Sequence, residues 1–171
     1  GSFVLGDSCE PKDTLKILKR CRDLRKDIFQ RIKLINRKFD FQSCKGDLNL
    51  SGLNNVEKSL YHGTIENRDI LNMAKNELQK SLPDRKRLGV LLNQHHLILR
   101  DCLHVSTPKI EAMLSAAMSA GALGGKINGS GGGGCMFAYA PDNPSAVAKA
   151  IKSVGGKAYI VDIDTGTKVL T

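Results

Sequence analysis

The stretch Lys126-Ile127-Asn128-Gly129-Ser130-Gly131-Gly132-Gly133-Gly134-Cys135 places five glycines and one serine between two short apolar runs. Glycine loses more backbone entropy on ordering than any other residue, and it adds no side-chain packing. Three structures account for such a run: a flexible Gly/Ser linker, a structural glycine hairpin, or a loop whose bare N–H groups close around an anion. Because the apolar run 135–140 follows without a polar gap, the anion loop is favoured, with the hairpin next and the linker last.

The glycine spacing separates this loop from two common nucleotide-binding motifs. Gly129, Gly131 and Gly134 satisfy G-x-G-x-x-G, but a dinucleotide site needs these glycines to lead from a strand into a helix, and here an apolar strand follows. A Walker loop needs Lys-Ser/Thr after the glycines, whereas Lys126 precedes them. We therefore predict a phosphate- or substrate-binding loop formed by Gly129, Ser130, Gly131, Gly132, Gly133 and Gly134.

Length and composition indicate one globular domain over residues 1–171. Hydrophobic residues make up 41% and charged residues 25% of the chain, and no apolar run is long enough to span a bilayer, so we expect no membrane partner. We also expect no signal peptide. The five cysteines form no C-x-x-C pair, which argues against a disulfide framework and a metal site, and favours reduced thiols in a cytoplasmic protein.

The formal net charge of +9 is concentrated near the start of the chain, where residues 12–38 hold eleven Lys or Arg against three Asp. A basic surface attracts anions in general, from nucleotides to nucleic acids. We interpret the charges as the solvated faces of an amphipathic helix and expect no nucleic-acid partner, because few aromatic residues interleave with them. A basic nucleic-acid binder stays open as the remaining alternative.

Hydrophobic periodicity predicts strands at 3–7, 126–128, 135–140 and 157–163, with helices at 109–121 and 144–154. This order is β-α-β-β-α-β, the ferredoxin-like split β-α-β plan of an α+β protein. Three inserted helices are predicted between the first strand and residue 109: from Pro11 to about 38, at 60–80, and at 84–104. Residues 168–170 could add a short edge strand.

Several side chains carry more specific predictions. Thr107 is expected to cap the helix at 109–121 with Pro108 at its first position, and Asn143 to cap the helix at 144–154. His95 lies in the apolar stripe of its helix and is interpreted as a core histidine, so a metal site is not expected. Asp101 adjoins Arg100, which favours an ion pair over a catalytic base. On the first inserted helix, one apolar stripe is predicted from Leu18, Cys21, Leu24, Ile28, Ile32 and Ile35.

The run from Gly125 to Cys135 resembles the third motif of the galactokinase, homoserine kinase, mevalonate kinase and phosphomevalonate kinase superfamily, the GHMP kinases. The stretches 92–101 and 105–111 are similar to the galactokinase pattern N-E-x-H-x-x-L-R-D…V-S-x-P-E-L-D, although Lys109 replaces the usual acidic residue. The opening stretch 3–14 is similar to the start of the C-terminal part of many such kinases. The resemblance implies a GHMP kinase C-terminal domain with the same α+β fold, closest to galactokinase.

In function, the resemblance implies an ATP-dependent kinase that phosphorylates a hydroxyl of a small molecule, first a sugar such as galactose. The alternatives are another GHMP kinase, acting on mevalonate, a heptose or another sugar, and a non-catalytic module that binds an anion or nucleotide. In this family the P-x-x-x-G-L-S-S-S-A phosphate loop and the aspartate base lie in the N-terminal half, and neither motif is found here.

The resemblance therefore implies the C-terminal part of a longer kinase, with no catalytic residue and no metal ligand in this chain. An N-terminal kinase domain of the same protein would be its partner and would bind most of ATP and Mg²⁺, and the chain alone would be inactive. We also expect that Gly131→Val blocks the approach of the phosphate to the loop while the fold survives.

Overall fold

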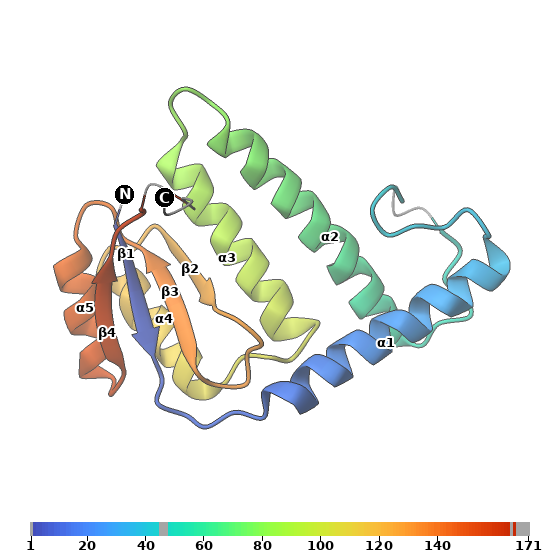
Figure 1. The fold of residues 1–171 in the computed structure, drawn as a ribbon, viewed down its shortest axis with the longest axis horizontal. Helices are drawn as coiled ribbons and strands as arrows, with labels where there is room; N and C mark the ends of the chain where they lie inside the picture. Colours follow the sequence, from blue (N-terminus) through green and yellow to red (C-terminus); the bar gives the residue numbers. More distant parts are fainter. Residues whose placement is uncertain (1, 45–47, 165, 167–171) are drawn as a thin grey trace, which may run out of the picture.

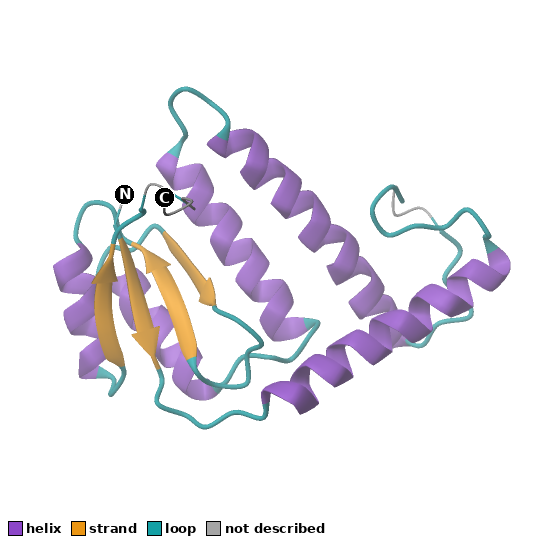
Figure 2. Ribbon diagram, viewed as in Figure 1, coloured by secondary structure: helices purple, strands orange, loops and turns teal. Residues whose placement is uncertain are grey.

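A computed structural model describes residues 2–44, 48–164 and 166 of the chain. Four strands form one antiparallel sheet in the order β2-β3-β1-β4, and the chain visits them as β1 (Phe3–Asp7), β2 (Gly124–Ile127), β3 (Cys135–Tyr139) and β4 (Lys157–Val161). The central strand β1 pairs on both sides, so that Leu5 lies opposite Phe137 on β3 and opposite Tyr159 on β4. The predicted ferredoxin-like α+β arrangement is confirmed (Figures 1 and 2).

Helices α4 (Pro108–Ser119) and α5 (Pro144–Ser153) lie together behind the sheet and bury its inner face (Figure 1). Their apolar residues join alternate residues of the strands in one hydrophobic cluster, in which Val4, Met113, Met136, Val147 and Ile151 are fully buried. Burial of such side chains stabilises the fold by about 1.5–3 kcal/mol each. This cluster is the main core of the domain.

The three inserted helices are α1 (Thr14–Ile35), α2 (Asn55–Leu78) and α3 (Arg85–Asp101). Helix α1 extends away from the sheet, and α2 returns towards it beside α3 (Figure 1). A second cluster holds α1 against α2 and the connection between them, with Ile28, Phe39 and Tyr61 in its centre. A smaller third cluster joins α2 to α3.

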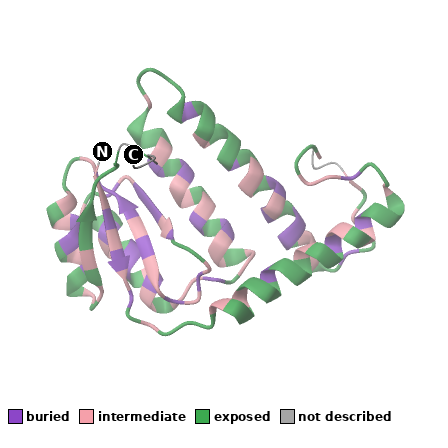
Figure 3. Ribbon diagram, in the orientation of Figure 1, coloured by how far each residue is buried: buried purple, intermediate pink, exposed green. Residues whose placement is uncertain are grey.

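The predicted apolar stripe on α1 is wrong in half of its members. Cys21, Ile28 and Ile32 are buried, but the side chains at the other three positions are exposed, with Leu18 at 51% and Ile35 at 79%. Figure 3 shows exposed positions along the whole length of α1. Periodicity identifies which residues share a helix face, but not how much of that face another element covers. Ile28 and Ile32 lie against α2 and the connection that follows α1, whereas Cys21 joins the main core.

The starts of α1 and α2 differ from prediction, and one predicted cap makes no side-chain hydrogen bond. Helix α1 begins at Thr14, because Asp13 accepts a hydrogen bond from the Lys16 N–H and caps it. Helix α2 begins at Asn55, five residues earlier than expected, because Asn54 and Glu57 form a capping box. Asn143 precedes α5 but makes no side-chain capping bond. The prediction for 168–170 lies outside the described residues.

Helix α3 packs against the free edge of β2 at a close backbone contact. A Cβ atom at Gly89 would lie 2.2 Å from the carbonyl oxygen of Leu123, and one at Gly124 would lie 2.1 Å from the carbonyl oxygen of Gly89. Only glycine at both positions allows this approach. The contact holds α3 along the strand that leads into the glycine loop. No helix in the described part of the chain combines the length and apolarity needed to cross a membrane.

Candidate functional site

The glycine loop connects β2 to β3 in a backbone conformation that glycine adopts readily. The φ angle is positive at five of its residues: Gly129 (74°), Gly131 (77°), Gly132 (71°), Gly133 (111°) and Gly134 (73°). Residues with a Cβ atom rarely adopt positive φ angles, so the backbone geometry of the loop accounts for its glycine content. The structure thus rules out an open linker and gives a defined turn-rich loop.

Most backbone N–H groups of this loop have no hydrogen-bond acceptor in the described part of the chain. Within the described ranges, the Gly132 N–H donates to the carbonyl of Val105 at 2.6 Å, while those of Gly129, Ser130, Gly131, Gly133 and Gly134 make no recorded hydrogen bond. The hydroxyl of Ser130 donates to the Gly131 carbonyl at 3.4 Å. Successive unpaired N–H groups in a concave backbone turn form an anion-binding arrangement. The predicted site residues are therefore together, with their donors free.

Both ends of the loop are anchored to neighbouring elements. The Asn128 N–H donates to the Cys135 carbonyl at 2.8 Å, and the Gly134 carbonyl accepts the Ser8 N–H at 2.8 Å. The loop therefore lies between the β1–α1 connection and the α3–α4 connection. Figure 1 shows it beside the first turn of α1 and the end of α3.

A lysine that the sequence motifs did not reveal lies at this loop. A Cβ atom at Gly134 would lie 2.8 Å from the Lys12 Nζ, and one at Gly129 would lie 3.8 Å from it. Among the described residues, no carboxylate pairs with this ammonium group. Lys12 immediately precedes the cap of α1, so the fold brings a cation from near the start of the chain to the free amides. Anions are attracted by such a combination.

The space next to Gly131 is filled by Val105 of the α3–α4 connection, which bears on the expected effect of Gly131→Val. A Cβ atom at this position would lie 2.4 Å from the carbonyl oxygen of Val105 and 2.6 Å from its Cβ. Gly131→Val would therefore displace the α3–α4 connection as well as fill the loop. Because Val105 already occupies this space, we expect the substitution to disturb the packing of the loop as well as the approach of the phosphate, and survival of the fold stays a prediction.

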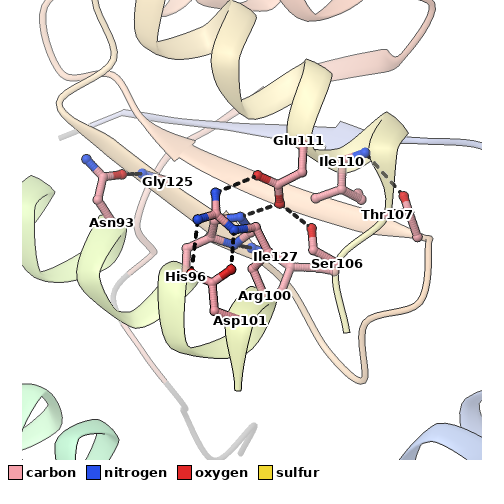
Figure 4. Close-up of polar contacts among 10 residues, drawn as sticks. All are labelled: Asn93, His96, Arg100, Asp101, Ser106, Thr107, Ile110, Glu111, Gly125 and Ile127. Atoms are coloured by element: carbon pink, nitrogen blue, oxygen red, sulfur yellow. Dashed lines mark hydrogen bonds and ion pairs between the residues drawn. The ribbon is translucent and has the colours of Figure 1, made fainter. Parts of the chain in front are cut away.

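Helix α3 supplies hydrogen-bond acceptors to the strand that enters the loop. The Asn93 Oδ1 accepts the Gly125 N–H at 2.9 Å, and the His96 Nδ1 accepts the Ile127 N–H at 3.3 Å (Figure 4). His96 is 6% exposed. The interpretation of His95 as the core histidine is wrong, because the adjacent residue faces β2 and His95 is only partly buried. Burial, and to a smaller extent the nearby charge of Lys126, lower the pKa of His95 to about 4.

Glu111 on α4 joins the groups around His96 into one polar network (Figure 4). Its Oε1 lies 2.8 Å from the His96 Nε2 and accepts the Ser106 hydroxyl, while its Oε2 lies 3.4 Å from the Arg100 Nη1. Burial alone would raise the pKa of Glu111, but the hydrogen bonds from Ser106 and His96 outweigh it and leave the pKa below its usual value. The carboxylate is therefore ionised at neutral pH.

The neighbouring acidic residue Asp101 is paired as expected. Its Oδ1 lies 2.7 Å from the Arg100 Nε and its Oδ2 lies 3.0 Å from the Arg100 Nη2. This hydrogen bonding holds the pKa of the Asp101 carboxyl below its usual value and raises that of the arginine. A carboxylate held in this way is a poor general base, since it is already stabilised in its ionised form.

An apolar groove lies away from the loop, on the outer face of the sheet. The groove, of about 600 Å³, runs between this face and helices α2 and α3, lined mainly by leucine and aromatic side chains such as Leu71, Leu91 and Phe137. The buried Oδ1 of Asn67, also in its lining, has no hydrogen-bond partner in the part of the chain that the structure describes. Across the described ranges, no group of three or more His, Cys, Asp or Glu side chains is placed to hold a metal ion.

Residues 74–157 match the family described as "GHMP kinases C terminal", and this part of the chain is a GHMP kinase C-terminal region. The family resemblance of the glycine motif is thereby confirmed.

Curated relatives include kinases for two substrates. A mevalonate kinase of Thermococcus gammatolerans is 46% identical over 97 residues, which cover 55% of this chain and 29% of the relative. A galactokinase of Lactococcus lactis is 32% identical over 144 residues, which cover 83% of this chain and 34% of the relative. The chain thus spans about a third of these proteins, and the identity is higher to the mevalonate kinase.

Among solved structures, a Lactococcus lactis galactokinase complexed with galactose has the same fold. Its TM-score is 0.81 at 21% sequence identity, over 94% of this chain and 44% of that one. At this identity the likeness concerns the fold alone. It covers 94% of this chain, so it includes α1 and most of α2, which lie before the family match at 74–157.

Proposed function

We propose that this chain is the phosphate-contacting C-terminal part of an ATP-dependent kinase that phosphorylates a hydroxyl group of a small molecule. The observation that carries the proposal is the cluster of amides that make no hydrogen bond within the described residues, at Gly129, Ser130, Gly131, Gly133 and Gly134, with the Lys12 ammonium beside them. Phosphoryl transfer depends on positioning and on stabilising the charge of the transferring group more than on covalent help from the protein. Preorganised N–H donors provide such stabilisation, and in well-studied oxyanion sites one donor contributes about 3 kcal/mol.

The residues of the loop fit the phosphate part of ATP. Bound there, the nucleotide would supply the phosphoryl group that is transferred. The amides of the loop would hold phosphate oxygens, and Lys12 would offset their charge. The loop is anchored at Val105, Ser8 and Cys135, so its donors need little reorganisation when the anion arrives. Mg²⁺ and the catalytic base are proposed to be held mainly by an N-terminal domain of the same protein.

Two substrates are proposed as candidates, and each is supported by a different observation. Mevalonate is supported by the 46% identity to the mevalonate kinase of Thermococcus gammatolerans. Galactose is supported by the longer match to the galactokinase of Lactococcus lactis, over 144 residues. We propose that the residues that select the substrate lie mostly outside this chain.

The test measures ADP formation with Mg·ATP and a panel of mevalonate, galactose, other hexoses and homoserine. We expect no turnover by the 171-residue chain alone, and substrate-dependent turnover by a longer protein that contains it. The ratio of kcat/KM for mevalonate and galactose then decides between the two candidates. Turnover by the 171 residues alone would show that a base lies within them. No turnover by the longer protein with any hydroxyl substrate would refute the proposed kinase activity.

A further inference from the structure

Strand β2 is an edge strand, and two of its N–H groups point away from the sheet. In the register with β3, Lys126 pairs with Phe137, so Gly125 and Ile127 direct their N–H groups to the free edge. Unpaired N–H groups at a buried edge are costly. Asn93 and His96 lie one helical turn apart on α3 and accept these two hydrogen bonds. Helix α3 thus takes the place of a missing neighbouring strand.

The contacts of His96 define which of its ring nitrogens carries the hydrogen. Because Nδ1 accepts the Ile127 N–H, the neutral ring carries its hydrogen on Nε2. The Nε2–H then donates to the Oε1 of Glu111, at 2.8 Å. The histidine therefore connects an acceptor for the backbone on one side with a charged acceptor on the other. Its environment uses both nitrogens, which a purely apolar core position would not require.

These hydrogen bonds form a closed ring of contacts, which meets the glycine loop near its start and at Gly132. From Ile127 the ring runs through His96 to Glu111, and Glu111 accepts the hydroxyl of Ser106. Ser106 follows Val105, whose carbonyl accepts the Gly132 N–H in the middle of the loop. Ile127 is two residues before Gly129, where the positive-φ stretch begins. The entry and the middle of the loop are thus tied to the same polar network.

We propose that His96 is a positioning residue for the glycine loop, acting through its Nδ1 on the Ile127 amide and oriented by Glu111. The proposal rests on the proposed function in one respect: the free amides of the loop are taken to be its phosphate donors. His96 itself does not contact the anion. His96 fixes the position at which the loop leaves β2. The contacts through Glu111 and Ser106 then hold that position at a constant distance from Gly132.

Two substitutions of His96 separate its two hydrogen bonds. In His96→Asn, the Oδ1 of the new side chain lies near the position of Nδ1 and can still accept the Ile127 N–H. In His96→Gln, the amide Nε2 lies near the histidine Nε2 and can still donate to Glu111. Both variants replace the ring with a neutral amide, so loss of core packing is similar in the two. A difference between them reports the hydrogen bond to the strand.

The first measurement is backbone amide hydrogen exchange of the 171-residue chain, resolved by residue and compared with its global unfolding. We expect the Ile127 amide to exchange about tenfold faster in His96→Gln than in His96→Asn, the factor for one lost hydrogen bond. The Gly125 amide serves as an internal control, because Asn93 holds it independently of the ring. Its protection should be equal in both variants.

The second measurement titrates the same samples with inorganic tripolyphosphate and follows the loop amides by NMR. We expect weaker binding in His96→Gln than in His96→Asn by a similar factor. Equal exchange in the two variants, or exchange at Gly125 that rises together with that at Ile127, would overturn the positioning role. If wild type does not bind tripolyphosphate, the proposed phosphate site fails, and the exchange data alone decide the role of His96.

Ser106→Ala keeps the proposal testable if neither histidine variant folds. This substitution removes only the hydroxyl that donates to Glu111, at a partly buried position. We expect faster exchange at Gly132 with unchanged exchange at Gly125. If exchange in this variant increases by the same factor at all amides of the sheet, the ring of contacts does not hold the loop in place.

Discussion

The contact between Gly89 on α3 and the end of the connection into β2 makes one substitution especially informative. In Gly89→Ala, the new Cβ would lie 2.2 Å from the Leu123 carbonyl oxygen, where real Cβ contacts are essentially never under 3.0 Å. The helix and the strand would have to separate by roughly 0.8 Å or more. Overpacking of this kind costs about 1–3 kcal/mol.

The separation also affects the hydrogen bonds that α3 makes with β2. The bond from Ile127 to His96 is already 3.3 Å long, and that from Gly125 to Asn93 is 2.9 Å long. Lengthening either beyond hydrogen-bonding range leaves a poorly solvated N–H, at about 1–3 kcal/mol each. Alanine gains about 1 kcal/mol of helix propensity over glycine. With one of the two bonds lost, the expected net loss in the free energy of unfolding is about 1–5 kcal/mol.

Urea denaturation of the 171-residue chain, followed by far-UV circular dichroism, measures this loss. Gly52→Ala is the matched control, because a Cβ atom there meets nothing within 4 Å and the residue lies in an exposed connection. We expect the control to stay within about 0.5 kcal/mol of wild type. A Gly89→Ala protein as stable as the control would refute the close approach of α3 to β2, and with it the structural basis for placing the loop.

Two further predictions concern charged groups. Lys12→Met should weaken tripolyphosphate binding about tenfold at low salt, with the difference shrinking as salt is raised, whereas Lys149→Met on the exposed face of α5 should leave calorimetric titrations unchanged. Equal effects of both changes would mean that only net charge matters. The Lys80 ammonium holds the pKa of Glu77 below its usual 4.5, so the stability from this group is present above that range and is lost as pH falls through the lower folded value. Glu77→Gln should therefore flatten the acid side of the stability profile measured by urea denaturation, while Glu66→Gln on the same helix should not; an unchanged acid limb in Glu77→Gln would contradict the pairing.

Elements with a strong local pattern were predictable from the chain alone. The order of strands and helices, the cap at Thr107 with Pro108 after it, and the Arg100–Asp101 ion pair are all confirmed. Each of these depends on residues within a few positions of one another. The family and the α+β fold follow from the glycine motif and this order of elements, and both are confirmed as well.

Groups whose position depends on distant parts of the chain were missed. Lys12 reaches the loop only because β1 pairs with β3 and directs the start of α1 towards Gly134. Glu111 became part of the site because α4 and α3 meet beside β2. No sequence spacing predicts contacts between such distant residues. The similarity of 92–101 and 105–111 to one kinase pattern did indicate that these two stretches lie close together.

The choice between His95 and His96 shows where sequence information ends. Both lie on α3, and helical periodicity placed His95 in the apolar stripe, since it considers only the polarity of side chains. The edge of β2 presents N–H groups that need acceptors, so the helix turns a polar histidine towards it and buries His96. Local sequence determined that a glycine loop and a split β-α-β sheet would form. Which cation, histidine and carboxylate surround that loop was decided by tertiary packing, because hydrogen bonds at a buried edge must be satisfied by whatever the fold brings there.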